Sequence, residues 1–331
     1  TTNVANGTVI PYNITGVTTT DISGGALTGN FTINNGTANV TINIAADLAT
    51  DGQDTLILSL NNGEASVSII INDTSLEPQL AGLLNAWYDA ADSSKVTTDV
   101  NNNVITWLDK GIYGNHLTVP STSKPTYNTR TFNGKNVVNF PVGTEYMRKA
   151  QMQIPKSNLS WYIVCQVDSV STFTDCILGY TGVTSEDSWQ IRPESSTQFK
   201  GSLVRGTAGT FRDTTYYGPE NKIGDYHLFQ IAFDDDNNED SIFLNGVFKE
   251  IIGNRSPILQ NNGTLILFAN RAGLTQPAGA VAEVICVNSV LLETRQKIEA
   301  YLTWKWGIQS KLPANHTYKT SGNPFTNFPI N

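Results

Sequence analysis

Apolar and polar residues alternate in short runs along most of the chain, and glycine and asparagine separate these runs. In Asn39-Val-Thr-Ile-Asn-Ile44 every second residue is apolar, as in an antiparallel strand with one buried face. The first 75 residues are therefore expected to form a small antiparallel β-sandwich. Its predicted strands are Val9–Ile14, Asn30–Ile33, Asn39–Ile44, Thr55–Leu60 and Ala65–Ile71.

After residue 83 a further series of short strand-like runs follows, separated by turns. Asn245-Gly246 directly follows one of these runs and is a strong signal for a two-residue hairpin. Many short strands separated by turns predict a jelly roll of two sheets. The main predicted strands are Val137–Phe140, Ser160–Val167, Cys176–Tyr180, Trp189–Arg192, His227–Phe233, Ser241–Leu244 and Leu265–Ala269.

One segment near the C-terminus has a helical period instead. Within Leu291–Gly307, Ile298, Leu302 and Trp306 recur at every fourth residue and form one apolar stripe. This pattern predicts a helix docked on the sandwich, with Trp304 and Trp306 as anchors. The alternative is that the two tryptophans form a platform on which a sugar stacks.

The strand pattern is interrupted between the two strand-rich parts of the chain. Pro78, within Thr74–Gln79, blocks the continuation of a strand, and the periodic pattern restarts only afterwards. We therefore expect a first domain over residues 1–75, a linker over 76–82, a second domain over 83–318 and a tail over 319–331.

The composition excludes some partners. Charged residues make up 15% of the chain, the net charge is −8 and the pI is near 4.9, which argues against nucleic-acid binding because phosphates attract a basic surface. No apolar run approaches the roughly 20 residues that span a bilayer, so we expect no membrane insertion. Cys165, Cys176 and Cys286 lie in apolar runs and are expected to be free buried thiols, with a Cys165–Cys176 disulfide as the alternative.

The first domain resembles the Calx-beta sandwich. The resemblance rests on Asp51-Gly-Gln-Asp54, on the two strands that follow it, and on Asn72-Asp73 at the end of the second strand. In that family such loops bind calcium, which implies Asp51, Asp54 and Asp73 as ligands, although Gln53 and Asn72 stand where an acid is often found. The opening strands of the family have no counterpart before Thr1, so we expect an incomplete module with a sheet edge that another segment pairs or covers.

The second domain resembles the laminin-G-like, concanavalin-like jelly rolls of phage particles and secreted bacterial surface proteins. Its opening carries an aromatic-Asp strand, a Trp-x-Asp-Lys segment and a Gly-Asn-x-hydrophobic turn, within Leu84–Asp92, Val104–Lys110 and Gly114–Leu117. Its closure reads Trp304-x-Trp306-Gly307 and then Leu312-Pro313. The resemblance implies a module that recognises surfaces and holds assemblies together.

Catalytic patterns are largely missing from the sequence. It contains three histidines and no zinc-protease helix, phosphate loop or dinucleotide fingerprint. Glycoside hydrolases of the concanavalin-like fold resemble one another in a Glu-x-Asp-x-x-Glu strand, and no stretch here matches it. Glu186-Asp187 and Glu239-Asp240 are adjacent pairs, whose side chains point to opposite faces of a strand. We therefore predict a non-enzymatic protein.

The strongest polar cluster is Asp234-Asp-Asp-Asn-Asn-Glu-Asp240, which lies between two predicted strands. Asp234, Asp236, Asn238 and Asp240 recur at every second residue, and side-chain oxygens in this pattern favour calcium. The alternative is a solvated acidic turn.

A second candidate is a cluster of aromatic and polar residues over 210–226. Such residues suit saccharide contact, because a ring stacks on the sugar while polar groups bind its hydroxyls; a protein interface or plain core packing are the alternatives. The predicted contact residues are Arg212, Tyr216, Tyr217, Asp225 and Tyr226.

Together these features predict a virion structural or decoration protein, of a capsid, tail or fibre, that exposes a lectin-like domain at the virion surface. Its expected partners are other virion proteins, copies of itself and a cell-surface glycan, and its expected cofactor is calcium. The first alternative is a secreted or cell-surface bacterial adhesin that binds carbohydrate. The second is a polysaccharide-degrading enzyme on the same fold.

Overall fold

The structure is a computed structural model of the 331-residue chain. It describes residues 4–45, 54–61, 63–71, 83–120, 122–152, 154, 158–170, 175–181, 189–193, 201–205, 212–215, 224–252, 262–270 and 276–320. The chain divides into two compact units, Thr1–Pro78 with Gly322–Asn331 and Gln79–Ser321.

The described part of the first unit contains a four-stranded antiparallel sheet in the order β2-β1-β3-β4. Its strands are β1 (Val9–Thr15), β2 (Thr28–Thr32), β3 (Asp54–Leu60) and β4 (Ser66–Ile71). Tyr12 and Ile14 of β1 and Leu56 of β3 face one side of the sheet and form a small core with Ile22, which lies between β1 and β2. The strand alternation in the sequence is therefore what gives this sheet one apolar face.

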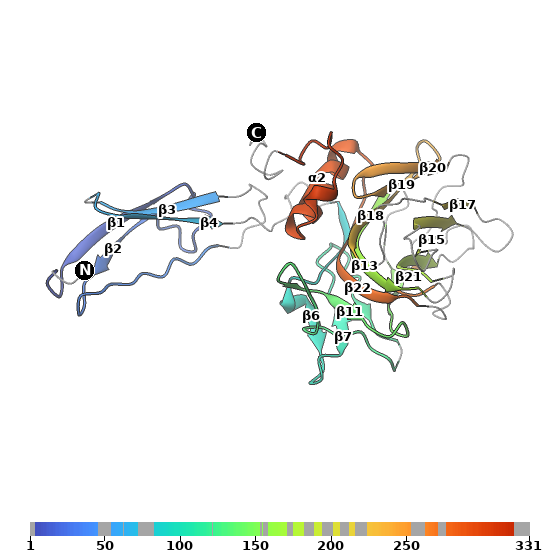
Figure 1. The fold of residues 1–331 in the computed structure, drawn as a ribbon, viewed down its shortest axis with the longest axis horizontal. Helices are drawn as coiled ribbons and strands as arrows, with labels where there is room; N and C mark the ends of the chain where they lie inside the picture. The colour runs from blue at the N-terminus through green and yellow to red at the C-terminus, as the bar shows by residue number, and fades with distance from the viewer. Residues whose placement is uncertain are drawn as a thin grey trace. The chain divides into compact units, whose positions relative to one another are not determined.

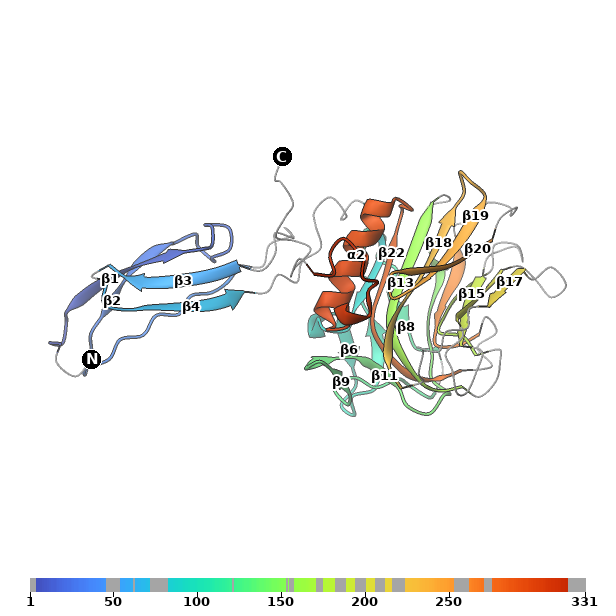
Figure 2. The ribbon, with the colours of Figure 1, turned by 45° about the horizontal axis from the view of Figure 1, so that its top comes forward.

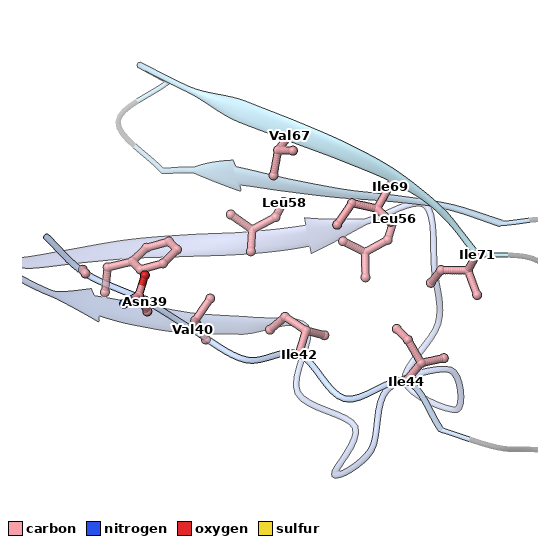
Figure 3. Close-up of a pocket in the computed structure, with 11 residues that line it drawn as sticks. Asn39, Val40, Ile42, Ile44, Leu56, Leu58, Val67, Ile69 and Ile71 are labelled. Atoms are coloured by element: carbon pink, nitrogen blue, oxygen red, sulfur yellow. The ribbon is translucent and has the colours of Figure 1, made fainter.

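The prediction of a strand over Asn39–Ile44 is wrong. The segment is extended, but its only ladder contact among the described residues is the single bridge from Ile44 to Ile22. Val40, Ile42 and Ile44 nevertheless point toward the apolar face of the sheet (Figure 3). The alternation predicted which way the side chains face, whereas a strand also requires a neighbouring backbone to pair with.

The second unit contains two antiparallel sheets (Figure 1). The first, here called the helix-bearing sheet, runs β11-β22-β13-β18-β19-β20, and β5 also pairs with β22. Its strands are β5 (Leu84–Asp89), β11 (Val138–Phe140), β13 (Leu159–Ser169), β18 (Tyr226–Asp234), β19 (Glu239–Leu244), β20 (Val247–Ile252) and β22 (Ala278–Val287). The long central strands are almost fully buried because both faces of this sheet are covered.

The opposite sheet runs β17-β16-β15-β14-β21-β12-β8-β7-β6. Its strands are β6 (Val96–Thr98), β7 (Val104–Trp107), β8 (Leu117–Thr118), β12 (Met147–Met152), β14 (Leu178–Thr181), β15 (Trp189–Pro193), β16 (Gly201–Arg205), β17 (Arg212–Thr215) and β21 (Gly263–Leu267). Two small elements flank the sheets, the hairpin of β9 (Thr131–Phe132) with β10 (Lys135–Asn136) and the 3-10 turn η1 (Ser93–Lys95).

Aromatic residues from both sheets interlock in the main core. Trp161 on β13 lies 5.6 Å from Trp189 on β15, measured between ring centroids, and Phe233 on β18 lies 5.4 Å from Trp189. All three side chains are fully buried. Contacts of this kind across two stacked sheets define a sandwich. The protein has the predicted all-β, jelly-roll-like architecture with a C-terminal helix.

The predicted closing helix is present as α2 (Leu292–Lys305), and the 3-10 turn η3 (Gln309–Lys311) follows it. It lies across the outer face of the helix-bearing sheet (Figures 1 and 2). Ile298, Leu302 and Trp306 are completely buried, which confirms the predicted stripe, while Trp304 is half-buried. Within the described ranges, no helix is both long and apolar enough to cross a membrane.

The three cysteines are free and buried, as expected from their apolar runs. Burial raises the pKa of the Cys165 and Cys286 thiols above the ordinary value. Both therefore stay protonated at neutral pH and pack as small apolar side chains.

Candidate functional site

A shallow pocket of about 410 Å³ lies beside the acidic hairpin that joins β18 to β19. Three parts of the chain meet there, namely the hairpin tip, the residue before β13 and the loop after β22. The lining residues are Asn158, Asp234, Asp236, Asn237, Asn288, Ser289, Val290 and Leu291. The pocket thus combines two carboxylates, three amides and an apolar rim.

Asn158 connects the hairpin tip to β13. Its Nδ2 donates to Oδ2 of Asp236 at 2.8 Å, and its Oδ1 accepts from the Asp235 amide at 3.0 Å. Asp234 accepts from both the backbone N–H and the Nδ2 of Asn237, at 3.0 and 2.8 Å. The carboxylates are therefore held in place by amides before any ligand arrives, which lowers the ordering cost of binding.

Two asparagines adopt backbone conformations that most residues avoid. Asn158 has φ 45° and Asn238 has φ 56°, both in the left-handed region. Asparagine tolerates this region better than most residues, so its frequency in the turns of this chain has a local physical reason. On the other side of the pocket, Ser160 Oγ donates to the Ser289 carbonyl at 2.7 Å and fixes the loop after β22.

The four residues predicted to bind calcium do not all lie together. The turn at 235–238 interrupts the strand, so the spacing of two residues does not place all four side chains on one face. Asp240 is fully buried on β19 and pairs with the core residue Phe233, whereas Asp234 pairs with Glu239 at the next position of the ladder. Successive ladder positions face opposite sides, so Asp240 lies on the opposite face from Asp234. Asp236 and Asn238 are exposed in the turn.

A cation at this pocket would therefore depend on Asp234, Asp236 and amide oxygens. Among the described residues no group of three or more His, Cys, Asp or Glu side chains is arranged to hold a metal ion. Calcium binds six to eight oxygens and accepts amide and backbone carbonyls, so two carboxylates with neighbouring amides are chemically suitable ligands. At the second predicted calcium set, Asp54 begins β3, while Asp51 and Asp73 lie outside the described residues.

The predicted aromatic cluster is only partly described. Tyr216 and Tyr217 lie outside the described residues, and Arg212 is described only as a backbone position in β17. Asp225 is exposed, with its carboxylate 3.7 Å from the ammonium of Lys311.

The last member of that cluster is a packed residue. Tyr226 is 7% exposed, and its ring stacks on Phe132 at a centroid distance of 3.7 Å and an interplanar angle of 7°. Burial raises the pKa of Tyr226 to about 12. Little of this ring is available to a sugar.

The Trp-x-Asp-Lys segment of the sequence has a structural role. Asp109 accepts three backbone hydrogen bonds of 2.7 Å, from Trp87, Gly111 and Asn115, and so ties the loop after β7 to β5. Burial raises the pKa of Asp109, and the three N–H donors oppose that shift. Lys110 forms ion pairs of 3.2 Å with Asp89 and Asp92.

A buried charged cluster lies between α2 and the sheet. Glu283 on β22 is fully buried and accepts from Trp87 Nε1 and Trp306 Nε1, each at 2.7 Å. Tyr301 Oη donates to it at 2.9 Å, and the ammonium of Lys305 lies 2.8 Å away. Every donor is a protein group in a closed interior, so this carboxylate is suited to holding the helix and not to reaching a substrate.

The three histidines make structural contacts. His116 Nδ1 accepts from the Asp109 amide at 3.0 Å, and His227 lies 3.1 Å from Asn245 Nδ2. His316 Nε2 lies 3.0 Å from Oε2 of Glu299, and both side chains are almost fully buried. The sequence placed no acid near His316, and the fold of the closing segment over α2 supplies one.

The sequence pattern pointed to Asp234 and Asp236 but not to Asn158, Asn288 and Ser289 of the same pocket. These residues lie more than 50 positions away along the chain and belong to no acidic run. The only local signal was that polar residues flank two long apolar strands. Their convergence depends on the pairing of β13 with β18 and β22.

No protein-family model matches this chain, and no sequence among curated proteins matches it. Solved structures share parts of the fold. Domain 4 of AbnA, a GH43 extracellular arabinanase from Geobacillus stearothermophilus, in complex with arabinotriose, is 14% identical with a TM-score of 0.49; the match covers 64% of this chain and 96% of that domain.

The botulinum neurotoxin serotype D binding domain is 9% identical with a TM-score of 0.46, and the match covers 68% of this chain and 52% of that domain. The CBM40 of the Ruminococcus gnavus IT-sialidase, bound to α2,3-sialyllactose, is 9% identical with a TM-score of 0.36, and the match covers 45% of this chain and 94% of that module. These likenesses concern the general arrangement of a β-sandwich and carry no argument about the ligand of this chain.

Proposed function

We propose that this chain is a non-enzymatic, lectin-like structural or decoration protein of a virion surface, whose second unit binds a glycan in the pocket beside the acidic hairpin. The proposed glycan binding is supported by one observation, namely that side chains distant in sequence surround one open pocket. These side chains are Asp234, Asp236, Asn158 and Asn288. Carboxylates and amides held in fixed positions are the groups that bind sugar hydroxyls with good geometry.

The apolar rim adds to this proposal. Leu291 is 68% exposed at the edge of the pocket and Leu292 beside it is 59% exposed. Small-molecule sites combine an apolar surface with a few well-placed polar groups, and a sugar ring offers both kinds of contact.

The non-enzymatic part rests on what the described carboxylates do. Glu283 and Asp89, which lie opposite each other on β22 and β5, share the ammonium of Lys305 in the closed interior. A general acid or base must reach its substrate and exchange protons there. The virion part rests on the paired-module resemblance found in the sequence, and the bacterial adhesin is its alternative.

Binding is tested by applying the full chain to a glycan array and measuring the Kd of each positive glycan by calorimetry. Asp236→Ala and Asn237→Ala should each weaken binding at least tenfold, while the matched control Asp225→Ala, in the other predicted cluster, should leave it unchanged. If Asp225→Ala weakens glycan binding and Asp236→Ala does not, the glycan binds at the aromatic cluster instead. If no glycan binds, the lectin-like function is wrong.

The virion location is tested by a mass-spectrometric inventory of purified particles and by gold-labelled antibody in micrographs. Labelled particles support the proposal, and label on bacterial cells alone supports the adhesin. Incubating positive glycans with the protein and analysing them by chromatography tests the absence of catalysis. Cleavage products would show that the protein is an enzyme.

A further inference from the structure

The first unit leaves an apolar groove on one face of its sheet (Figure 3). The groove has a volume of about 500 Å³, and all of its lining residues are uncharged. On the sheet side it is lined by Leu56 and Leu58 of β3 and by Val67, Ile69 and Ile71 of β4. The extended segment at 38–44 forms its other wall.

β4 forms the edge of this sheet as well as a wall of the groove. It pairs with β3 along Ser66–Ile71, and the described residues place no strand on its other side. Val67 and Ile69 are 53% and 57% exposed. An edge strand presents a row of N–H and C=O groups that a further strand can pair with.

Three edge strands of the sheets in the second unit carry features that oppose such pairing. β20 contains Lys249 and Glu250, and its ladder to β19 has a register shift. β6 has three residues and a register shift, and β17 contains Arg212 and Asp213. Short length, charge and bulges are the means by which natural proteins protect their edges. β4 reads Ser-Val-Ser-Ile-Ile-Ile, with no charge and no shift in its ladder.

The sequence of β4 is complementary to itself. In an antiparallel pair of two β4 strands centred on Ile69, Ile69 lies opposite Ile69 of the second strand, and Val67 lies opposite Ile71. These three residues share the groove face, so every pair on that face is apolar. Ser68 then lies opposite Ile70 on the other face. Cross-strand apolar pairs stabilise an antiparallel sheet, and no like charges meet in this register.

We infer that β4 is a self-association surface, through which two copies of this chain join their four-stranded sheets into one continuous sheet. The contact is isologous, with the same strand contributed by each copy, as in most homodimers. It adds backbone hydrogen bonds at an open edge and shields Val67 and Ile69 from water. This inference does not depend on the glycan site in the second unit.

The register permits a sharp test on the full chain. Cα atoms directly opposite each other in an antiparallel pair lie roughly 4.5–5.5 Å apart, within the range that a disulfide spans. Under mild oxidation Ile69→Cys should therefore form a covalent dimer on a non-reducing gel. The matched control Val67→Cys should not, because the two introduced cysteines would be four residues out of register. The native cysteines are buried and do not compete.

Association itself is measured by light scattering after size-exclusion chromatography over a range of concentrations. The wild-type chain should be dimeric, and Ile69→Lys should be monomeric because it places two ammonium groups opposite each other. Ile70→Lys, on the other face of the same strand, should remain dimeric. Circular dichroism confirms that each variant is folded. A monomeric wild-type chain would overturn the inference, as expected if a different protein covers the groove. A dimer in which Ile69→Cys gives no cross-link would also overturn it.

Discussion

The ammonium of Lys305 lies 2.8 Å from Oε2 of Glu283, in the closed layer between α2 and β22. Oδ1 of Asp89 lies 2.8 Å from the same ammonium. Asp89 and Glu283 are directly opposite each other on β5 and β22, so their like charges would repel without the lysine. Burial alone would lower the pKa of Lys305, but the two carboxylates raise it above the ordinary value.

We expect Lys305→Met to reduce the free energy of unfolding by about 3–5 kcal/mol, because it leaves the buried Glu283 without a cation and leaves Asp89 with Lys110 alone. Urea unfolding at pH 7 measures this loss. The control is Lys311→Met, which removes a half-exposed lysine 3.7 Å from Asp225 and should cost less than about 1 kcal/mol. Equal losses in the two variants would show that the buried cluster does not hold α2.

Trp306→Ala should cost about 3–5 kcal/mol, since it empties a fully buried site and removes a donor to Glu283. Trp304→Ala should cost less, because Trp304 is half-buried and its indole N–H donates to the Tyr318 carbonyl at 3.1 Å and not to a buried charge. Chemical denaturation of both variants makes the comparison. A loss below about 1 kcal/mol for Trp306 would contradict its role as an anchor and favour the sugar platform.

Acid should destabilise the second unit partly through Asp99. Hydrogen bonds from Asn103, followed by those from Asn101 and Lys124, lower the pKa of Asp99 from 3.8 to about 2. A carboxyl whose pKa is lower in the folded state contributes stability that is present above pH 4 and is lost as the pH falls toward 2. Asp99→Asn should flatten the decline of stability between pH 4 and 2. Urea titrations at pH 5, 4, 3 and 2.5 measure the free energy of unfolding. If it declines equally in Asp99→Asn and in the wild-type chain, Asp99 makes no such contribution.

If calcium binds at the acidic hairpin, saturating calcium should raise the melting temperature of the wild-type chain, because a ligand of the native state adds stability. Asp236→Ala should abolish that increase while barely changing the melt in chelator, since Asp236 is exposed. Magnesium should substitute poorly because it requires a smaller octahedral shell. An equal shift in both proteins would place the cation elsewhere, with Asp51, Asp54 and Asp73 as the next candidates. If calcium shifts the melting temperature of neither protein, the hairpin is a solvated acidic turn.

The two units should differ in their ability to fold as separate fragments. A fragment spanning 79–321 contains the complete jelly roll, and we expect a cooperative melt with β-type circular dichroism. A fragment spanning 1–75 should be poorly folded as a monomer, because its apolar groove stays open to water. A stable monomeric 1–75 fragment would contradict this expectation.

The sequence alone determined the local elements and the direction in which side chains face. Strand-like runs located β3 and β18, and a recurrence at every fourth residue located the buried stripe of α2, because backbone geometry sets which side chains share a face. Even where Asn39–Ile44 failed to pair, its apolar side chains faced the sheet as the alternation required.

The distant residues that meet in space are set by the three-dimensional fold. The spacing of two residues suggested one set of oxygens from Asp234 to Asp240, but the turn between them places Asp240 on the opposite face from Asp234. Strand pairing instead brings Asn158 and Asn288 to the hairpin tip, and it places Glu283 opposite Asp89 beneath Lys305. Such contacts depend on register and sheet order, which arise from packing the whole core and not from any local period.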